Sequence, residues 1–116
     1  DVGAGAGSFL DEFSKLLPDA ALRAVEPSAI FSRTNRNLSR QVFEGYAAAA
    51  AIDPAWRASG DLVTCFEVIE HIVDVDAFIA SLRAYSRAYL SLSNTLRTTP
   101  VHVYRFAVPG LLFAVH

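Results

Sequence analysis

The first seven residues, D-V-G-A-G-A-G, join an apolar strand end to glycines at alternate positions. Glycine lacks a Cβ and tolerates positive φ, so Gly3, Gly5 and Gly7 let the backbone turn sharply and lie against a ligand. Apolar residues then recur with helical spacing, which predicts a helix over 8–17 with Ser8 as its N-cap. The free N–H groups of a helix start attract an anion or a carboxylate. Glycine-rich turns also occur for purely structural reasons, so this motif does not identify a function by itself.

An acidic residue follows the glycine turn. Glu26 ends a predicted strand over 22–26 and lies 19 residues after Gly7. A carboxylate at this place can accept hydrogen bonds from both hydroxyls of a ribose. The alternative is an ordinary strand-end carboxylate that faces water. We expect Glu26 to have little to pack against, so that its removal would weaken ligand binding and leave folding nearly unchanged.

A third group of polar residues lies in F-E-V-I-E-H, residues 66–71, where another predicted strand leaves the sheet. His71 is the candidate catalytic base, because the ordinary pKa of histidine lies near working pH. The alternative is that Glu70 and His71 only cap and orient the next helix. Residues three and four apart share a helix face, so Glu67, Glu70 and His71, with His102, could instead converge on a metal ion. We favour no metal.

Strands and helices alternate along the chain. Predicted strands cover 22–26, 41–46, 61–66 and 89–93, and predicted helices cover 8–17, 29–38, 47–51 and 76–88, with a helix start near 108–113. This alternation predicts an α/β fold with a doubly wound, mostly parallel, Rossmann-like sheet and helices on both faces. Right-handed crossovers place the carboxyl ends of all parallel strands on one edge, where ligands bind. The three polar groups fall on that edge.

Composition restricts the classes of protein that fit. The 116 residues are 53% apolar and 19% charged, which suits one globular domain. Ten basic and twelve acidic residues argue against nucleic acid as a partner. One cysteine excludes an internal disulfide and suits the cytoplasm, and no apolar run reaches the ~18 residues of a membrane span. The chain starts within a motif, so we expect residues 1–116 to be one domain, incomplete at both ends, whose sheet a longer chain or a homo-oligomer completes.

Four segments in order, D-V-G-A-G-A-G, A-V-E-P-S, D-L-V-T-C-F-E-V-I-E-H-I and L-S-L-S-N-T, resemble class I S-adenosylmethionine-dependent methyltransferases. The resemblance covers nearly the whole chain and is greatest to the small-molecule branch typified by ubiquinone-biosynthesis O-methyltransferases. It implies methyl transfer from S-adenosylmethionine to an oxygen or carbon of a small-molecule acceptor. It also implies a sheet with two further strands after the one predicted over 89–93. We expect these two strands and most of the first strand to lie outside this sequence.

The resemblance also implies roles for individual residues. The methionine moiety would lie against Asp1 and the turn of Gly3, Ala4, Gly5 and Gly7. Glu26 would hold the ribose, Pro27 and Ser28 would flank the adenosine, and Gly45 and Tyr46 would border the adenine. Phe66 and Glu67 would line the passage from the sulfonium to the acceptor. Many relatives carry an aspartate that holds the adenine amino group where Tyr46 stands, and this sequence departs from them there.

Two other classes remain as alternatives. An NAD(P)- or FAD-binding Rossmann oxidoreductase has the turn G-x-G-x-x-G, whose third glycine would fall on Ser8, and gives no reason for E-V-I-E-H. A catalytically inactive methyltransferase-like binding domain is the other.

The remaining polar and aromatic residues have structural interpretations. We expect Cys65 to be inert core and Trp56 to pack in the core rather than cover the adenine. We expect Arg33, Arg36 and Arg40 to form a solvated helix face.

Overall fold

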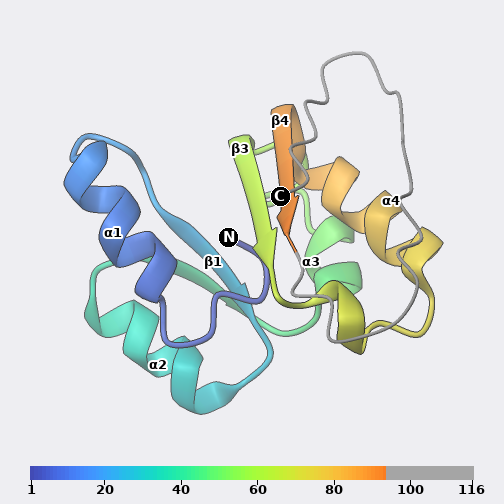
Figure 1. Ribbon diagram of the computed structural model, residues 1–116, viewed down its shortest axis with the longest axis horizontal. Coiled ribbons are helices and arrows are strands. Elements are labelled where there is room, and N and C mark those ends of the chain that lie inside the picture. Colours follow the sequence, from blue (N-terminus) through green and yellow to red (C-terminus); the bar gives the residue numbers. More distant parts are fainter. Residues whose placement is uncertain (94–116) are drawn as a thin grey trace.

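The computed structural model describes residues 1–93 and contains alternating helices and strands (Figure 1). In chain order these are α1 (Ser8–Leu16), β1 (Arg23–Glu26), α2 (Ala29–Asn37), β2 (Gln41–Glu44), α3 (Ala47–Ile52), β3 (Gly60–Phe66), the 3₁₀ helix η1 (Ile69–His71), α4 (Val75–Tyr85) and β4 (Ser86–Ser93). The predicted helix start near 108–113 and His102 lie outside the described residues.

Val2 joins two pairs of parallel strands. β1 pairs with β2, and β3 pairs with β4. The N–H of Gly3 donates to the carbonyl of Val25 (2.8 Å), and the N–H of Val2 donates to the carbonyl of Thr64 (2.8 Å). The bridge between Val2 and Val25 is parallel. The order is therefore β2–β1–Val2–β3–β4, and the carboxyl ends of all the strands share one edge. This confirms the predicted α/β fold.

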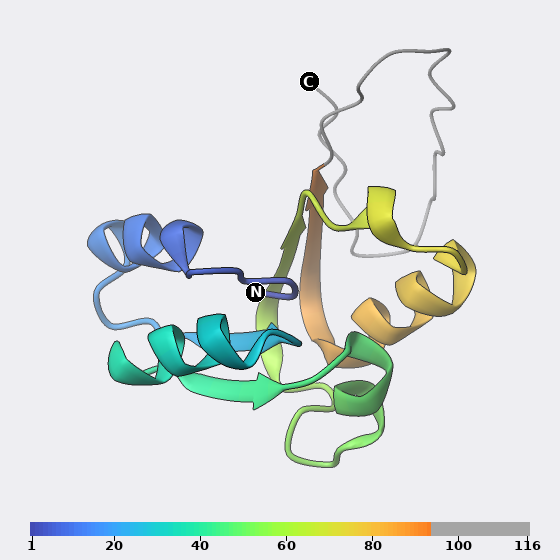
Figure 2. The same ribbon diagram turned by 90° about the horizontal axis from the view of Figure 1, so that it is seen from below.

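Helices cover both sides of these strands. α1 and α2 lie on one side, and α3 and α4 lie together on the other (Figures 1 and 2). Leu10 of α1 is buried against Ala4 and Ala24, which fastens α1 to the glycine segment and to β1. This arrangement leaves the loops after the strands together at one edge.

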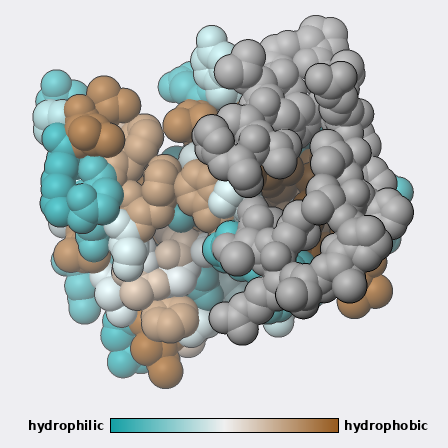
Figure 3. Space-filling model, in the orientation of Figure 1, coloured by the Kyte–Doolittle hydropathy of each residue, from teal (hydrophilic) through white to brown (hydrophobic). Residues whose placement is uncertain are grey.

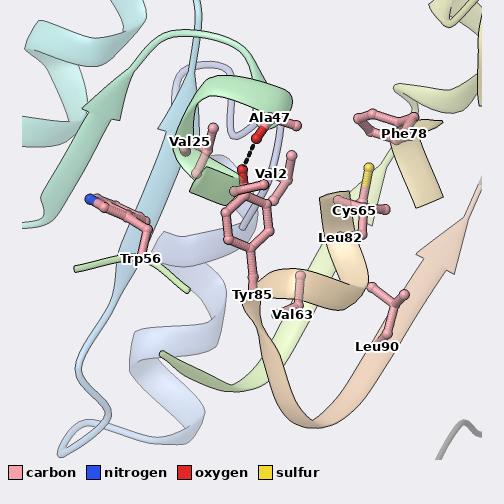
Figure 4. Packing of buried hydrophobic residues seen from close by; sticks show 12 residues of the cluster. Val2, Val25, Ala47, Trp56, Val63, Cys65, Phe78, Leu82, Tyr85 and Leu90 are labelled. Atoms are coloured by element: carbon pink, nitrogen blue, oxygen red, sulfur yellow. Dashed lines mark hydrogen bonds between the residues drawn. The ribbon is translucent and has the colours of Figure 1, made fainter. Parts of the chain in front are cut away.

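The main core lies between the sheet and the α3–α4 pair (Figure 4). Leu82, Leu90 and Cys65 are almost fully buried. The hydroxyl of Tyr85 donates to the carbonyl of Ala47, which ties α4 to α3. Burial raises the pKa of the Cys65 thiol to about 12, so the thiol stays protonated and unreactive. The interpretation of Cys65 as inert core is confirmed.

Trp56 also belongs to this core. Its ring lies edge-on to Phe43, with centroids 5.8 Å apart, and the guanidinium of Arg23 lies 4.0 Å from the Trp56 ring centroid. Only 7% of Trp56 is exposed, so its predicted packing role is confirmed.

The boundary between α4 and β4 differs from the prediction. The helix predicted over 76–88 ends at Tyr85, and the strand predicted from Tyr89 begins at Ser86. Ser86 has extended φ and ψ and pairs with Gly60 in the sheet. Sheet pairing therefore overrides the helix propensity of the residues around Ala88.

The surface over α1 and α2 mixes apolar and hydrophilic areas (Figure 3). Leu16 and Ile30 are largely exposed there, and Arg36 forms an exposed ion pair with Glu44 (2.8 Å). Within residues 1–93, none of the helices has both the length and the apolar run that crossing a membrane requires.

Candidate functional site

The glycine turn, residues 3–7, follows Val2 in the centre of the sheet and leads into α1. Gly3, Gly5 and Gly7 all have positive φ, at 75°, 53° and 90°. The N–H of Gly7 donates to the carbonyl of Ala4 (2.9 Å), which closes the turn. Gly7 itself is the N-cap of α1, so the prediction of Ser8 as N-cap is wrong. Gly7 brings no capping side chain, so the N–H groups of the first helical turn stay available to an anion.

The three glycines face different surroundings. A Cβ on Gly3 would collide with the side chain of Val68, and a Cβ on Gly7 would collide with Arg40 and Asn35. A Cβ on Gly5 would meet nothing within 4 Å. Gly5 is therefore the position at which the turn presents an open face.

Glu26 is buried and makes more hydrogen bonds within the protein than its sequence position predicts. Its side chain is buried, with Oε2 accepting the N–H of Gly5 (2.8 Å) and Oε1 accepting the N–H of Ser28 (2.8 Å). Its carbonyl accepts the N–H of Gly45 (3.1 Å) and the hydroxyl of Ser32 (2.9 Å). The expectation that Glu26 has little to pack against is wrong.

The carboxylate of Glu26 keeps binding capacity despite these bonds. A carboxylate offers about four lone-pair positions, and two are used by the N–H groups of Gly5 and Ser28. Each oxygen can still accept one donor, so two neighbouring hydroxyl groups fit this acceptor. The bond to Gly5 places that acceptor directly beside the open face of the turn.

The segment after β3 borders the glycine turn. Val68 fits against Gly3, and the rings of Phe66 and Phe9 meet edge-on with centroids 4.7 Å apart. Glu67 has a φ of 55°, which is uncommon outside glycine and recurs at functional sites. Its N–H donates to the carbonyl of Ser93 (3.1 Å), while its side chain is exposed.

His71 lies further out, in η1, with 76% of its side chain exposed. Its Nε2 lies 3.9 Å from Oε1 of Glu70. Among residues 1–93, no three histidine, cysteine, aspartate or glutamate side chains are grouped so that they could hold a metal ion.

The other predicted residues that follow β1 and β2 lie at the same edge. Asp1 accepts the hydroxyl of Thr64 through Oδ1 (2.8 Å). Ser28 is the N-cap of α2, and the adjacent Pro27 is exposed. Tyr46, next to Gly45, is the N-cap of α3 and is 75% exposed.

Sequence reasoning missed two buried residues that hold the turn. Asn35 is fully buried and donates through Nδ2 to the carbonyl of Gly5 (2.8 Å). Arg40 is only 8% exposed and donates through Nη1 to the carbonyl of Gly7 (3.2 Å). The expectation that Arg40 joins a solvated face is therefore wrong, although Arg33 and Arg36 are exposed as expected. Arg40 falls just after α2, where helical periodicity no longer indicates which way a side chain points.

A groove of about 560 Å³ lies at the opposite edge of the sheet, beside the amino ends of the strands. It is lined by Leu22 and Arg23 at the amino end of β1, by Gly60 and Leu62 at the amino end of β3, and by apolar side chains of α1 such as Phe13. Its lining includes Asp1 but none of Gly3, Gly5, Gly7 and Glu26, so the groove lies apart from the open face of the glycine turn.

Comparison with known proteins identifies the family. A family model described as a methyltransferase domain matches residues 1–88. The chain belongs to this methyltransferase domain family. It is 34% identical over 88 residues to a ubiquinone biosynthesis O-methyltransferase of Rhodopseudomonas palustris (strain BisA53), an alignment that covers 72% of this chain and 33% of that protein.

A solved structure has the same fold. It is the crystal structure of the plantazolicin methyltransferase BpumL in complex with a pentazolic desmethylPZN analog and SAH. The TM-score is 0.61 at 18% identity, over 74% of this chain and 33% of that one. The methyltransferase domain described here therefore spans about a third of the length of each of these relatives.

Proposed function

We propose that the full-length protein is an S-adenosylmethionine-dependent methyltransferase that methylates an oxygen or carbon of a small-molecule acceptor. The observation that carries this proposal is the bond from the N–H of Gly5 to Glu26 (2.8 Å). It unites an open glycine turn with a carboxylate that can still accept two hydroxyls, which suits an amino-acid moiety and a ribose joined in one ligand. Family membership and the solved relative with bound SAH support the same cofactor.

The residues present fit this cofactor. Asp1 and the turn of Gly3, Ala4, Gly5 and Gly7 would hold the methionine moiety, near the uncapped start of α1. Glu26 would accept the ribose hydroxyls. Pro27 and Ser28 would flank the adenosine, Gly45 and the exposed ring of Tyr46 would border the adenine, and Phe66 and Glu67 would line the passage to the acceptor.

Catalysis then depends mainly on positioning. S-adenosylmethionine supplies an electrophilic methyl group whose leaving group is a neutral thioether. The turn and Glu26 would hold the donor, while Phe66 would limit the access of water to the line of attack. His71, with its exposed imidazole, would take the proton from a hydroxyl or an acidic carbon of the acceptor. A single buried thiol, Cys65, is consistent with a reaction in the cytoplasm.

Calorimetry on the full-length protein tests this function. We expect saturable binding of S-adenosylhomocysteine and no binding of NAD or FAD. Glu44→Ala is the matched control for Glu26→Ala. Glu44 also ends a strand and is the register partner of Glu26, but it is exposed, so Glu44→Ala should bind S-adenosylhomocysteine like the wild type. Binding of NAD without binding of S-adenosylhomocysteine would establish the oxidoreductase alternative and overturn the proposal.

A further inference from the structure

Two side chains, one in the last turn of α2 and one three residues after α2, contact the glycine turn. Asn35 donates through Nδ2 to the carbonyl of Gly5 (2.8 Å) and accepts Nη1 of Arg40 at Oδ1 (2.8 Å). Arg40 donates through Nη1 to the carbonyl of Gly7 (3.2 Å) and through Nη2 to the carboxylate of Asp11 in α1. We call Asn35 and Arg40 together the α2 brace.

A buried arginine is costly unless its donors are paired. In the part of the chain that the structure describes, the partners of the Arg40 guanidinium are the carbonyl of Gly7, the carboxylate of Asp11 and its brace partner Asn35. Within residues 1–93, the brace therefore directs a buried charge at the glycine turn and at Asp11 in the first turn of α1.

The brace and Glu26 act on opposite polar groups of the same residue. The N–H of Gly5 is held by Glu26, and its carbonyl is held by Asn35. Ordering the backbone of a residue costs conformational entropy, and glycine loses the most freedom. If only the cofactor ordered the three glycines, the entropy cost of ordering them would weaken cofactor binding. If the brace orders the turn beforehand, cofactor binding does not include that cost.

We propose that Asn35 and Arg40 are positioning residues that set the affinity for the cofactor by pre-forming the glycine turn. Neither residue touches the cofactor in this scheme; both act through the carbonyls of Gly5 and Gly7. The inference rests on the proposed function, because it assigns the turn to S-adenosylmethionine.

The test compares Arg40→Met with Arg36→Met in the full-length protein. Arg36 lies in the last turn of α2, four residues before Arg40, but it is exposed and pairs with Glu44, so it is the matched control. For Arg40→Met we expect the Kd for S-adenosylhomocysteine to rise by about tenfold or more. We expect kcat at saturating S-adenosylmethionine to stay near the wild-type value, and Arg40→Lys to restore part of the affinity. Arg36→Met should match the wild type in each measurement.

Amide hydrogen exchange supplies a readout that needs no ligand. In Arg40→Met, exchange should accelerate in residues 3–11 and stay unchanged in β3 and α4. If wild-type protein failed to bind S-adenosylhomocysteine, the proposed function would fail, while exchange in residues 3–11 would still decide whether the brace orders the turn.

A second substitution covers the case in which Arg40→Met does not fold. Asp11→Asn removes the charge that pairs with Arg40, and the Asp11 side chain is 47% exposed, so the fold should tolerate it. We expect faster exchange in residues 3–11 and weaker S-adenosylhomocysteine binding. Unchanged affinity and unchanged exchange in a folded variant would overturn the inference, as would equal acceleration of exchange across the whole domain.

Discussion

Replacing Gly5 by alanine should separate cofactor binding from folding. Gly5 has a φ of 53°, and an L-residue in this left-handed conformation costs roughly 1–2 kcal/mol. The added methyl group meets no protein atom within 4 Å, so no clash adds to that cost. The free energy of unfolding should therefore fall by about 1–2 kcal/mol.

The same methyl group would project into the face of the turn where we place the cofactor. A steric conflict that costs about 1.4 kcal/mol lowers affinity tenfold, so the Kd for S-adenosylhomocysteine should rise by at least that factor. Urea denaturation would measure the free energy of unfolding, and calorimetry would measure the Kd.

Alanine at Gly7 is the matched control. Its φ is also positive, but its Cβ would collide with Arg40 and Asn35. Gly7→Ala should therefore cost clearly more stability than Gly5→Ala. The reasoning would be refuted if Gly5→Ala bound S-adenosylhomocysteine like the wild type, or if it destabilised the protein as much as Gly7→Ala.

Three further predictions concern other residues. Glu26→Ala leaves two N–H groups without an acceptor, so the free energy of unfolding should fall by about 1–3 kcal/mol. Calorimetry should also show weaker S-adenosylhomocysteine binding. Glu44→Ala should produce neither effect. His71→Ala should lower kcat by about 10²-fold or more in methyl-transfer assays without changing that binding; unchanged kcat would exclude His71 as the base. The pKa of Cys65 is raised from 9.0 to about 12 by burial, so the unfolded chain loses this proton first and stability should fall as pH rises from 9.0 towards 12. Urea titrations at several pH values should show a shallower fall for Cys65→Ala, and an equal slope would contradict this.

Much of the fold could be predicted because its determinants are local. Strand and helix patterns alternate, and the alternating glycines before Ser8 mark the turn into α1. The predicted strand over 61–66 and helix over 29–38 agree with β3 and α2 to within one residue at each end. The boundary at Ser86 could not be predicted, because it depends on pairing with Gly60, which is distant in the chain.

The site was predictable as a set of residue types, and less so as a set of contacts. Glu26 was identified from its spacing after Gly7, but its bonds to two backbone N–H groups depend on the meeting of two loops. Arg40 resembled a solvated arginine because nothing in its neighbours reveals the carbonyl of Gly7 and the carboxylate of Asp11. Long-range hydrogen bonds of this kind leave no periodic pattern in the sequence.

A crystal structure of the full-length protein with S-adenosylhomocysteine tests the central claim most directly. The account predicts ribose hydroxyls within hydrogen-bond distance of the Glu26 carboxylate and the amino-acid moiety over the open face of Gly5. It also predicts that the groove between the amino ends of β1 and β3 holds no ligand. A ligand seated in that groove, with Glu26 bonded only to the N–H groups of Gly5 and Ser28, would contradict the account.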